Sequence, residues 1–292
     1  MVTPTKETSR VIVRLPTGFM ALFIALVLLA TPTLQGQEYL STGEVATIGG
    51  GAAAVFGLAH LVGNADSTRN PLIGGPLPLE ASLQRWLGGR CSLGQTNFLD
   101  NKRGSSYTAI TAALLLVSAD LAWPRYEKGK ELGQDLFLFT SGVLATQGAT
   151  SLLKTIVARP RPLLCLEPEL AGQRKKIDNY YDRQSFPSGH TSSAFFACAY
   201  LNLRLRAIMR RELHAGEYRD YRWLPPTVLF SWASFVGWSR IHAYKHFVSD
   251  VMVGAAVGVL MAELFYQFAD DPDVTDNVSG GAPMVVSYRW TF

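Results

Sequence analysis

Five apolar segments with few charges follow one another between residues 107 and 267, and this pattern limits the fold more than any other feature of the chain. The segments cover residues 107–123, 135–157, 190–204, 226–239 and 246–267. Each is long enough for a helix of several turns, and the charged residues lie mostly near the segment ends. Residues 45–62 form a sixth, weaker segment that is rich in Gly and Ala. We therefore predict an all-α fold, a helical bundle of about six core helices that is embedded in a membrane.

These segments do not by themselves distinguish a membrane bundle from a soluble one. Residues 107–123 and 226–239 are short for a bilayer, which needs about 20 apolar residues per helix. A soluble bundle that buries the same residues in its own core has the same pattern. The net charge of +4 is small and the basic residues are scattered, so the composition does not indicate a nucleic-acid partner.

The N-terminal residues have the composition of a targeting segment. Lys6, Arg10 and Arg14 precede an unbroken apolar run of twelve residues, Phe19 to Ala30, and small residues follow it. A run of this length fits the core of a signal peptide better than a spanning helix. An uncleaved anchor over residues 17–36 is the alternative, and both predict that the chain is directed into or across a membrane.

The charged loops predict which side of the membrane each segment end faces. Residues 204–222 contain six arginines, and the loop around Arg125 is also basic. The positive-inside rule places both loops in the cytoplasm, so residues 158–189 and 240–246 face the opposite side together. This requires that residues 45–62 do not cross, and we interpret them as a peripheral or re-entrant helix. An uncleaved N-terminal anchor would then bring the number of spans to six.

Three short polar blocks lie in or directly beside the two segments that face the same side. They are Lys154 with Arg161-Pro162, then Pro187-Ser188-Gly189-His190, then Ser239-Arg240 with His246 and Asp250. Together they supply three cations, two histidines, a carboxylate and a Ser-Gly turn. These groups are suited to holding a phosphate and transferring it through a histidine.

The cations and the turn fit the charge of a phosphoryl group. In phosphoryl transfer, negative charge spreads over three equatorial oxygens, so catalysis is mainly positioning and electrostatic stabilisation. Lys154, Arg161 and Arg240 can surround these oxygens, and arginine donates two parallel hydrogen bonds from a planar fork. Ser188 adds a hydroxyl donor, and Gly189 permits a close approach of the backbone. A helix that begins here would also direct its free N–H groups at the anion.

The two histidines can divide the nucleophilic and acid–base roles. His246 and Asp250 are four residues apart and share one face if both lie on a helix. The carboxylate can then accept the ring N–H of His246 and leave the other nitrogen free to attack phosphorus. His190 is the candidate general acid, which protonates the leaving oxygen and later activates water.

The order and spacing of the blocks resemble the signature of the type 2 phosphatidic acid phosphatase / vanadium-dependent haloperoxidase superfamily. That signature is Lys, six residues, Arg-Pro; then Pro-Ser-Gly-His; then Ser-Arg, five residues, His, three residues, Asp, and every fixed position matches. The resemblance covers residues 107–268 and implies a helical core with metal-independent hydrolysis of phosphate monoesters or diphosphates. It implies these roles: His246 nucleophile, His190 acid, Asp250 orienting group, and Lys154, Arg161, Ser188, Gly189 and Arg240 phosphate ligands.

On this basis we divide the chain into four regions. They are residues 1–36, a signal peptide or N-terminal anchor; residues 37–106, a peripheral region; residues 107–268, the helical phosphatase core; and residues 269–292, a tail.

The resemblance and the topology together lead to a functional hypothesis. We expect a phosphatase of the inner membrane, with its active site on the periplasmic side, that hydrolyses a lipid phosphate or diphosphate through a phosphohistidine. The substrate would be an anionic phospholipid or a polyprenyl phosphate, and no cofactor is needed, although vanadate could occupy the phosphate site. The alternatives are a soluble periplasmic acid phosphatase of the same superfamily, a vanadate-dependent haloperoxidase, and a non-catalytic membrane scaffold with an anion pocket.

Two further patterns in the sequence each have a functional and a purely structural interpretation. His242, His246 and Asp250 have a spacing that can bind a metal, but Arg240 is an unfavourable neighbour for a divalent cation. We therefore predict no metal site and a structural role for His242. Cys91 and Cys165 would both face an oxidising compartment, where a disulfide between them and two independent thiols are equally compatible with the sequence.

Overall fold

The structure is a computed structural model that describes residues 40–63, 71–77, 79–88, 104–123, 130–172 and 183–269. Within these ranges it contains helices and no strands, which confirms the predicted all-α class. Six helices have 19 residues or more. They are α2 (Thr42–Gly63), α4 (Gly104–Ala122), α5 (Lys130–Val157), α9 (Gly189–Glu212), α11 (Leu224–His242) and α12 (Val248–Tyr266). All six overlap the apolar segments from which we predicted the core.

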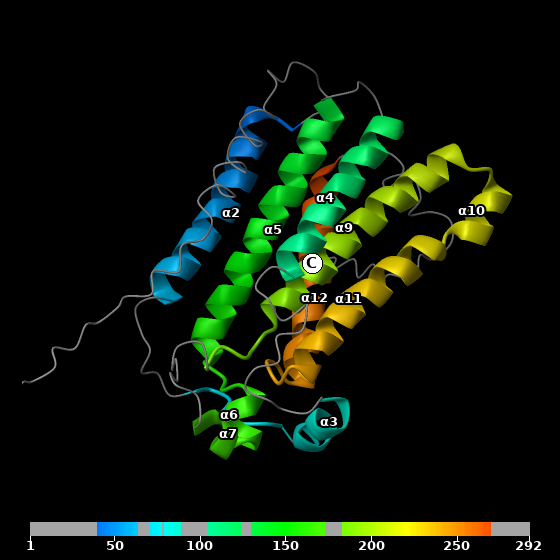
Figure 1. Cartoon of the computed structure of the whole chain (residues 1–292). Coiled ribbons are helices and arrows are strands. Elements are labelled where there is room, and N and C mark those ends of the chain that lie inside the picture. The colour runs from blue at the N-terminus through cyan, green and yellow to red at the C-terminus, as the bar shows by residue number, and fades with distance from the viewer. Residues whose placement is uncertain are drawn as a thin grey trace, which may run out of the picture.

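Shorter helices close the two ends of this bundle. One end carries α3 (Glu80–Leu87), α6 (Pro162–Leu166) and α7 (Pro168–Gly172), and the other carries α10 (Ala215–Tyr221), as Figure 1 shows. A short 3-10 helix, Gln267–Ala269, follows α12. The sequence pattern did not reveal α3, which packs against α11 and α12.

The long helices run alternately toward and away from the α3 end (Figure 1). α5 and α11 run toward it, whereas α4, α9 and α12 run away from it. The basic residues of the segment from Arg204 to Arg222 therefore gather at the α10 end. The three polar blocks lie at the opposite end, as we predicted from the charges of the loops.

Helix α9 lies at the centre because small residues and aromatic rings let its neighbours pack closely around it. A Cβ atom on Gly258 of α12 would lie only 2.3 Å from the Ser192 carbonyl oxygen of α9. Such contact between backbones is typical of helices that pack in membranes through small residues. On the other side, the rings of Phe139, Phe196 and Tyr200 pack in tilted and edge-on arrangements, with centroids 5.5–6.0 Å apart. The start of α12, and with it Asp250, is thereby held against the start of α9.

A buried ion-pair cluster fastens α9 to two other helices. Arg204 is fully buried, and its Nε atom lies 2.6 Å from Asp120 Oδ1 of α4 and 3.3 Å from Asp135 Oδ2 of α5. Removing one member of such a cluster would leave an uncompensated charge in an apolar interior. The cluster therefore fixes the relative positions of α4, α5 and α9.

The outer surface of the bundle has the composition of a lipid-facing surface. Among the described residues, three helical stretches are long and apolar enough to cross a membrane: Thr42–Val62, Leu132–Leu166 and Val248–Ala269. Large apolar side chains also point outward, with Met252 and Leu260 of α12 exposed by 66% and 63%. Contiguous exposed apolar surface of this kind marks an interaction with a membrane or a partner. The bundle is therefore described as membrane-embedded.

The prediction that residues 45–62 form a peripheral or re-entrant helix is wrong. The whole of α2 lies alongside α5 and has the length and hydropathy of a span (Figure 1). It runs in the same direction as α5, from the end with the basic loops to the end with the polar blocks. The charge rule excluded a crossing here because it was combined with a signal peptide or an anchor in residues 1–36, which lie outside the described residues. Among the described residues, α2 and the five helices that overlap the other apolar segments make up the six long helices of the bundle.

Several predictions concern residues outside the described ranges. The signal peptide or anchor at residues 1–36, the tail from residue 270 and Cys91 all lie there. Cys165 is a half-buried residue of α6, and its pairing with Cys91 stays a prediction.

Candidate active site

The three polar blocks converge at the α3 end of the bundle, each at the end of a different helix. Lys154 lies in the last turn of α5, and Arg161 precedes α6. Ser188 is the N-cap residue of α9, and Gly189 and His190 are its first two residues. The third block supplies Arg240 in the last turn of α11, His246 in the following loop, and Asp250 in the first turn of α12. The structure thus brings together all eight residues that the sequence predicted.

The Ser-Gly turn provides a cradle next to a cation. A Cβ atom on Gly189 would lie 3.4 Å from Lys154 Nζ and 3.5 Å from Thr150 Cγ2, which are ordinary contact distances, so Gly189 lies directly beside the lysine side chain. Ser188 donates its backbone N–H to the Asp250 carbonyl oxygen at 2.9 Å, and its hydroxyl accepts from Thr191 at 2.8 Å. Because α9 begins here, its free N–H groups and its dipole favour an anion at the same point.

His246 is held as a neutral imidazole with a defined tautomer. Its Nδ1 atom lies 2.5 Å from the Ser185 carbonyl oxygen, and only 2% of its side chain is exposed. A carbonyl oxygen can only accept, so Nδ1 carries the hydrogen and Nε2 is unprotonated. Burial, followed by the charges of Arg161, Lys154 and Arg240, holds the pKa of His246 well below its ordinary value. A neutral imidazole with a free Nε2 can act as a nucleophile at neutral pH.

Asp250 does not make the direct hydrogen bond to His246 that we predicted. Its Oδ2 atom is 3.9 Å from His246 Nδ1. Instead Oδ2 accepts hydrogen bonds from the Ser185 hydroxyl at 2.5 Å and the Phe247 N–H at 2.8 Å. The prediction assumed that both residues share a helical face, but α12 begins only at Val248 and His246 lies in the loop before it. Asp250 therefore orients Ser185, and the Ser185 carbonyl orients the imidazole.

His190 carries an imidazole nitrogen that the protein leaves for another group. Its Nε2 atom is buried and has no hydrogen-bond partner among the described residues. Arg240, Lys154 and Arg161 all lie close enough to His190 to act on it electrostatically. A buried polar atom without a partner is costly unless a ligand or water bonds to it. This position fits an acid–base group that meets an oxygen of a bound anion.

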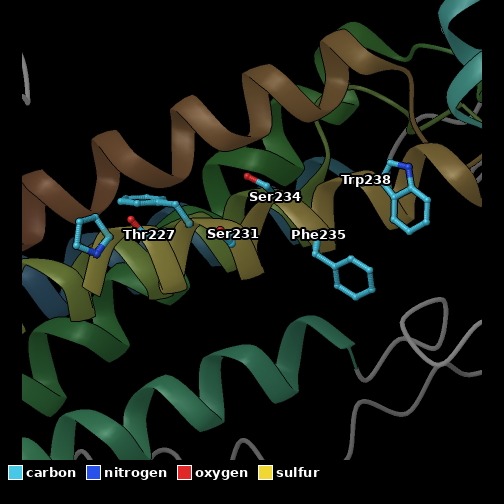
Figure 2. A pocket seen from close by; sticks show the side chains of 7 residues that line it. Thr227, Ser231, Ser234, Phe235 and Trp238 are labelled. Carbon is cyan, nitrogen blue, oxygen red and sulfur yellow. The ribbon is translucent and has the colours of Figure 1, made fainter. Parts of the chain in front are cut away.

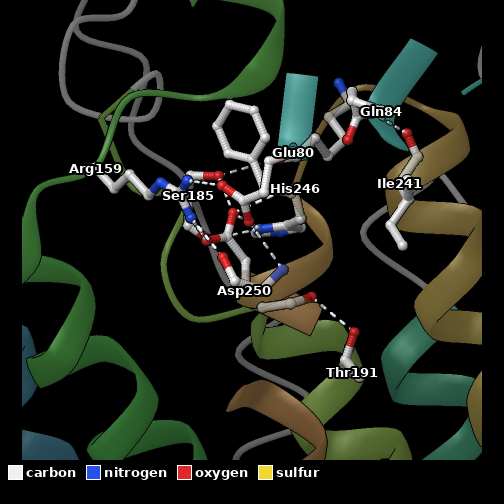
Figure 3. Close-up of polar contacts among 12 residues, drawn as sticks. Glu80, Gln84, Arg159, Ser185, Thr191, Ile241, His246 and Asp250 are labelled. Atoms are coloured by element: carbon white, nitrogen blue, oxygen red, sulfur yellow. Dashed lines mark hydrogen bonds and ion pairs between the residues drawn. The ribbon is translucent and has the colours of Figure 1, made fainter. Parts of the chain in front are cut away.

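Sequence reasoning missed three members of the site, which Figure 3 shows with Asp250 and His246. Arg159 lies two residues before Arg161 and is completely buried, with Nη1 2.6 Å from Asp250 Oδ1. Ser185 lies between Asp250 and His246 as described above. Glu80 reaches the site from α3 and contacts Arg159. The Arg-x-Arg spacing at 159 and 161 was a possible signal for the first, but nothing in the sequence indicates Glu80.

His242 is the last residue of α11. Its ring lies 5.0 Å from the Trp238 ring, centroid to centroid, on the exposed side of α11. No group of three His, Cys, Asp or Glu side chains that could hold a metal ion was found among the residues with described positions.

Comparisons with known proteins fit this geometry. Residues 135–272 match the family model of the PAP2 superfamily. The human protein called phospholipid phosphatase 2 is 30% identical over 191 residues, which cover 56% of this chain and 64% of that protein. A probable diacylglycerol pyrophosphate phosphatase 1 of Schizosaccharomyces pombe is 31% identical over 132 residues, covering 40% of this chain and 47% of that protein.

A third relative shares a shorter region. The lipid A 1-phosphatase of Porphyromonas gingivalis is 42% identical over 86 residues, covering 30% of this chain and 16% of that protein. The chain therefore matches less than two thirds of the length of each of these three relatives. All three names describe a phosphatase of a phosphorylated lipid, but the lipid differs from one name to the next.

Proposed function

We propose, because residues 135–272 match the family model of the PAP2 superfamily, that this chain is a membrane phosphatase that hydrolyses a lipid phosphate or diphosphate monoester through a phosphohistidine. The reaction uses no metal ion. The observation that carries the proposal is the state of His246, whose Nδ1–H is bonded to Ser185 while Nε2 is free among three cations.

The first step forms a bond between His246 Nε2 and phosphorus. The nitrogen lone pair attacks opposite the leaving oxygen, and the bond between phosphorus and that oxygen breaks. The developing negative charge on the equatorial oxygens is stabilised by Lys154, Arg161 and Arg240. The proton on the leaving oxygen comes from His190, because the charge of the bound phosphate favours the protonated imidazole.

The second step removes the phosphoryl group from His246. His190, now neutral, accepts a proton from water, and the resulting hydroxide attacks phosphorus. The bond between nitrogen and phosphorus breaks, orthophosphate is released, and His246 returns to its neutral state. Vanadate adopts the geometry of the pentacoordinate transition state, so the same groups would bind it as an inhibitor.

The position of the site supports a lipid substrate. The polar blocks lie at one end of a bundle whose outer surface is apolar, so a lipid tail can stay in the bilayer while its head group reaches the cations. An anionic phospholipid or a polyprenyl phosphate has the required chemistry. The basic loops at the other end support an orientation with the site on the periplasmic side of the inner membrane.

The test measures phosphate release by the purified protein in mixed micelles. The substrates are phosphatidate, diacylglycerol pyrophosphate and a polyprenyl diphosphate, each assayed with a metal chelator. His246→Ala should lower kcat by several orders of magnitude, as for other covalent nucleophiles. His242→Ala is the matched control, since it removes an imidazole one turn earlier without touching the site, and it should keep activity within threefold of wild type. Full activity of His246→Ala, or complete inhibition by the chelator, would contradict the proposal.

A further inference from the structure

Glu80 is a buried carboxylate that lies outside the segment matched by the family model. It occupies the first position of α3, and only 5% of the residue is exposed. Its Oε2 atom accepts hydrogen bonds from the Leu77 N–H at 2.6 Å and from Arg159 Nη2 at 2.5 Å. Its Oε1 atom accepts from the Ser249 N–H at 3.1 Å. Burial raises the pKa of Glu80, but the bonds from Ser249, Leu77 and Arg159 outweigh it and hold the pKa below its ordinary value.

Arg159 connects this carboxylate to the active site. Its Nη1 atom donates to Asp250 Oδ1 at 2.6 Å and to Ser249 Oγ at 2.8 Å, whereas Nη2 donates to Glu80. Its Nε and Nη2 atoms also reach the Gly75 carbonyl oxygen at 3.3 and 3.0 Å. Every nitrogen of the buried guanidinium is therefore committed, and the Phe247 ring lies 4.2 Å from its central carbon. The two carboxylates fix both ends of one planar group (Figure 3).

The contacts form a continuous chain from α3 to the imidazole. Glu80 holds Arg159, Arg159 holds Asp250, Asp250 holds the Ser185 hydroxyl, and the Ser185 carbonyl accepts from His246. Glu80 also accepts the Ser249 N–H, which is one of the free N–H groups at the start of α12. This second contact places the helix turn that carries Asp250.

We propose that Glu80 is a positioning residue for phosphoryl transfer, acting through Arg159 and Asp250 to orient the nucleophilic imidazole of His246. The inference rests on the proposed function for its kinetic test. The contacts of Glu80 described above reach none of the phosphate ligands Lys154, Arg161 and Arg240 and neither histidine, so it contributes to the rate through geometry and not through substrate contact.

The geometry requires a carboxylate at this position. Both oxygens of Glu80 accept from N–H donors, one from Ser249 and the other from Leu77 and Arg159. In Glu80→Gln the amide NH2 must face one of these donors in either orientation. One contact is therefore lost, and Arg159 keeps Asp250 as its single carboxylate. Glu80 could also matter only because it helps α3 to pack against the bundle. Gln84, one turn later in α3, separates the two roles, because it donates to the Ile241 carbonyl oxygen at 2.6 Å and does not touch Arg159.

A double-mutant cycle tests the proposal with the wild type, Glu80→Gln, Asp250→Asn and the double variant. Residues coupled through one network show non-additive effects on the order of a tenfold change in rate. Glu80→Gln should lower kcat at least tenfold and leave KM for the lipid within twofold, and it should lower kcat less than twofold further in the Asp250→Asn protein. Equal factors in the two backgrounds, or a change in kcat below twofold in Glu80→Gln alone, would overturn the proposal. So would a loss of the same size in Gln84→Ala, which should stay within threefold of wild type.

A second measurement separates failure of this inference from failure of the proposed function. If the wild type releases no phosphate from any lipid, the proposed function fails, but the orientation of His246 is still measurable by 15N NMR of histidine-labelled protein in detergent. The signals are assigned with His246→Ala. The wild type should show the tautomer with hydrogen on Nδ1, and Glu80→Gln should show a mixture of both tautomers. An unchanged tautomer in Glu80→Gln would then refute the positioning role.

Discussion

Replacing Gly258 of α12 by alanine should destabilise the bundle and slow the reaction together. The new Cβ atom would lie 2.3 Å from the Ser192 carbonyl oxygen, 2.8 Å from the Phe196 nitrogen and 2.9 Å from the Phe195 Cβ atom. Ordinary contacts of a Cβ atom begin at 3.4 Å, and two of the three neighbours are backbone atoms that cannot rotate away. The two helices must therefore separate by about 1 Å, an overpacking that costs about 1–3 kcal/mol.

The separation would also displace active-site residues, because the first turns of α9 and α12 both carry residues of the site. Ser188 at the start of α9 donates its N–H to the Asp250 carbonyl oxygen of α12 at 2.9 Å, two helical turns from Gly258. A shift of about 1 Å breaks this bond and displaces Asp250 from Ser185. We expect kcat to fall more than tenfold, since misplacement of this size can cost about a hundredfold.

Gly216→Ala is the matched control for this substitution. Gly216 lies in α10 at the far end of the bundle, and a Cβ atom there would meet nothing within 4 Å. Both changes gain the helix propensity of alanine, about 1 kcal/mol at most, so the comparison isolates the contact. The free energy of unfolding is measured by titrating purified protein in mixed micelles with SDS, and kcat is measured in the same micelles. Equal stability and activity of the two variants would show that α9 and α12 do not depend on this close approach.

Two other predictions follow from local features of the site. Burial and the charges of Arg161, Lys154 and Arg240 lower the pKa of His246, so the neutral nucleophile persists below pH 6.5 and the acidic limb of kcat/KM should lie below that value. Lys154→Met removes one of these charges and so raises the pKa of His246. The acidic limb of kcat/KM should therefore move to higher pH, even though overall activity falls. An acidic limb that stays in place or moves to lower pH would contradict the assignment of His246 as the nucleophile. Ala158 ends α5 in the left-handed conformation, with φ 50°, so Ala158→Gly should stabilise the fold by about 0.5–1 kcal/mol in the same SDS titration, whereas a loss of stability would show that the conformation is not strained.

The sequence predicted the site residues better than their mutual contacts. Their order and spacing placed each block at a helix end, and the charges of the loops placed all the blocks on one side. The prediction of a direct hydrogen bond between His246 and Asp250 was wrong, because a spacing of four residues implies a shared face only inside a helix. The chain turns at Tyr244, where φ is 54°, and α12 starts two residues after His246. The carbonyl of Ser185, 61 residues away in the sequence, takes the place that we assigned to the carboxylate.

The crossing by α2 and the role of Glu80 were missed for other reasons. The charge rule depends on how many crossings precede a loop, so the expectation that residues 1–36 direct the chain across the membrane removed α2 from the count. Glu80 is separated from Arg159 by 79 residues and from Ser249 by 169, and its side chain meets them only because α3 packs against the ends of α11 and α12. No local pattern of residue types encodes such a contact.

The charges around Glu80 also bear on how the site accepts a phosphate. Arg159, Glu80 and Asp250 are buried and, when ionised, together carry a net charge of −1. Burying three charges is costly, so such a group is weak evidence for stability and stronger evidence for a fixed geometry. Lys154, Arg161 and Arg240 carry three positive charges when ionised, and the two groups together have a charge of +2. A phosphate monoester has a charge of about −2 at neutral pH, so it balances these six side chains, and a protonated His190 brings the total to +1. In Glu80→Gln this balance changes to +3, and the phosphate would still be attracted while the imidazole loses its alignment. A loss in kcat without a loss in affinity is therefore what the electrostatics and the hydrogen bonds both predict.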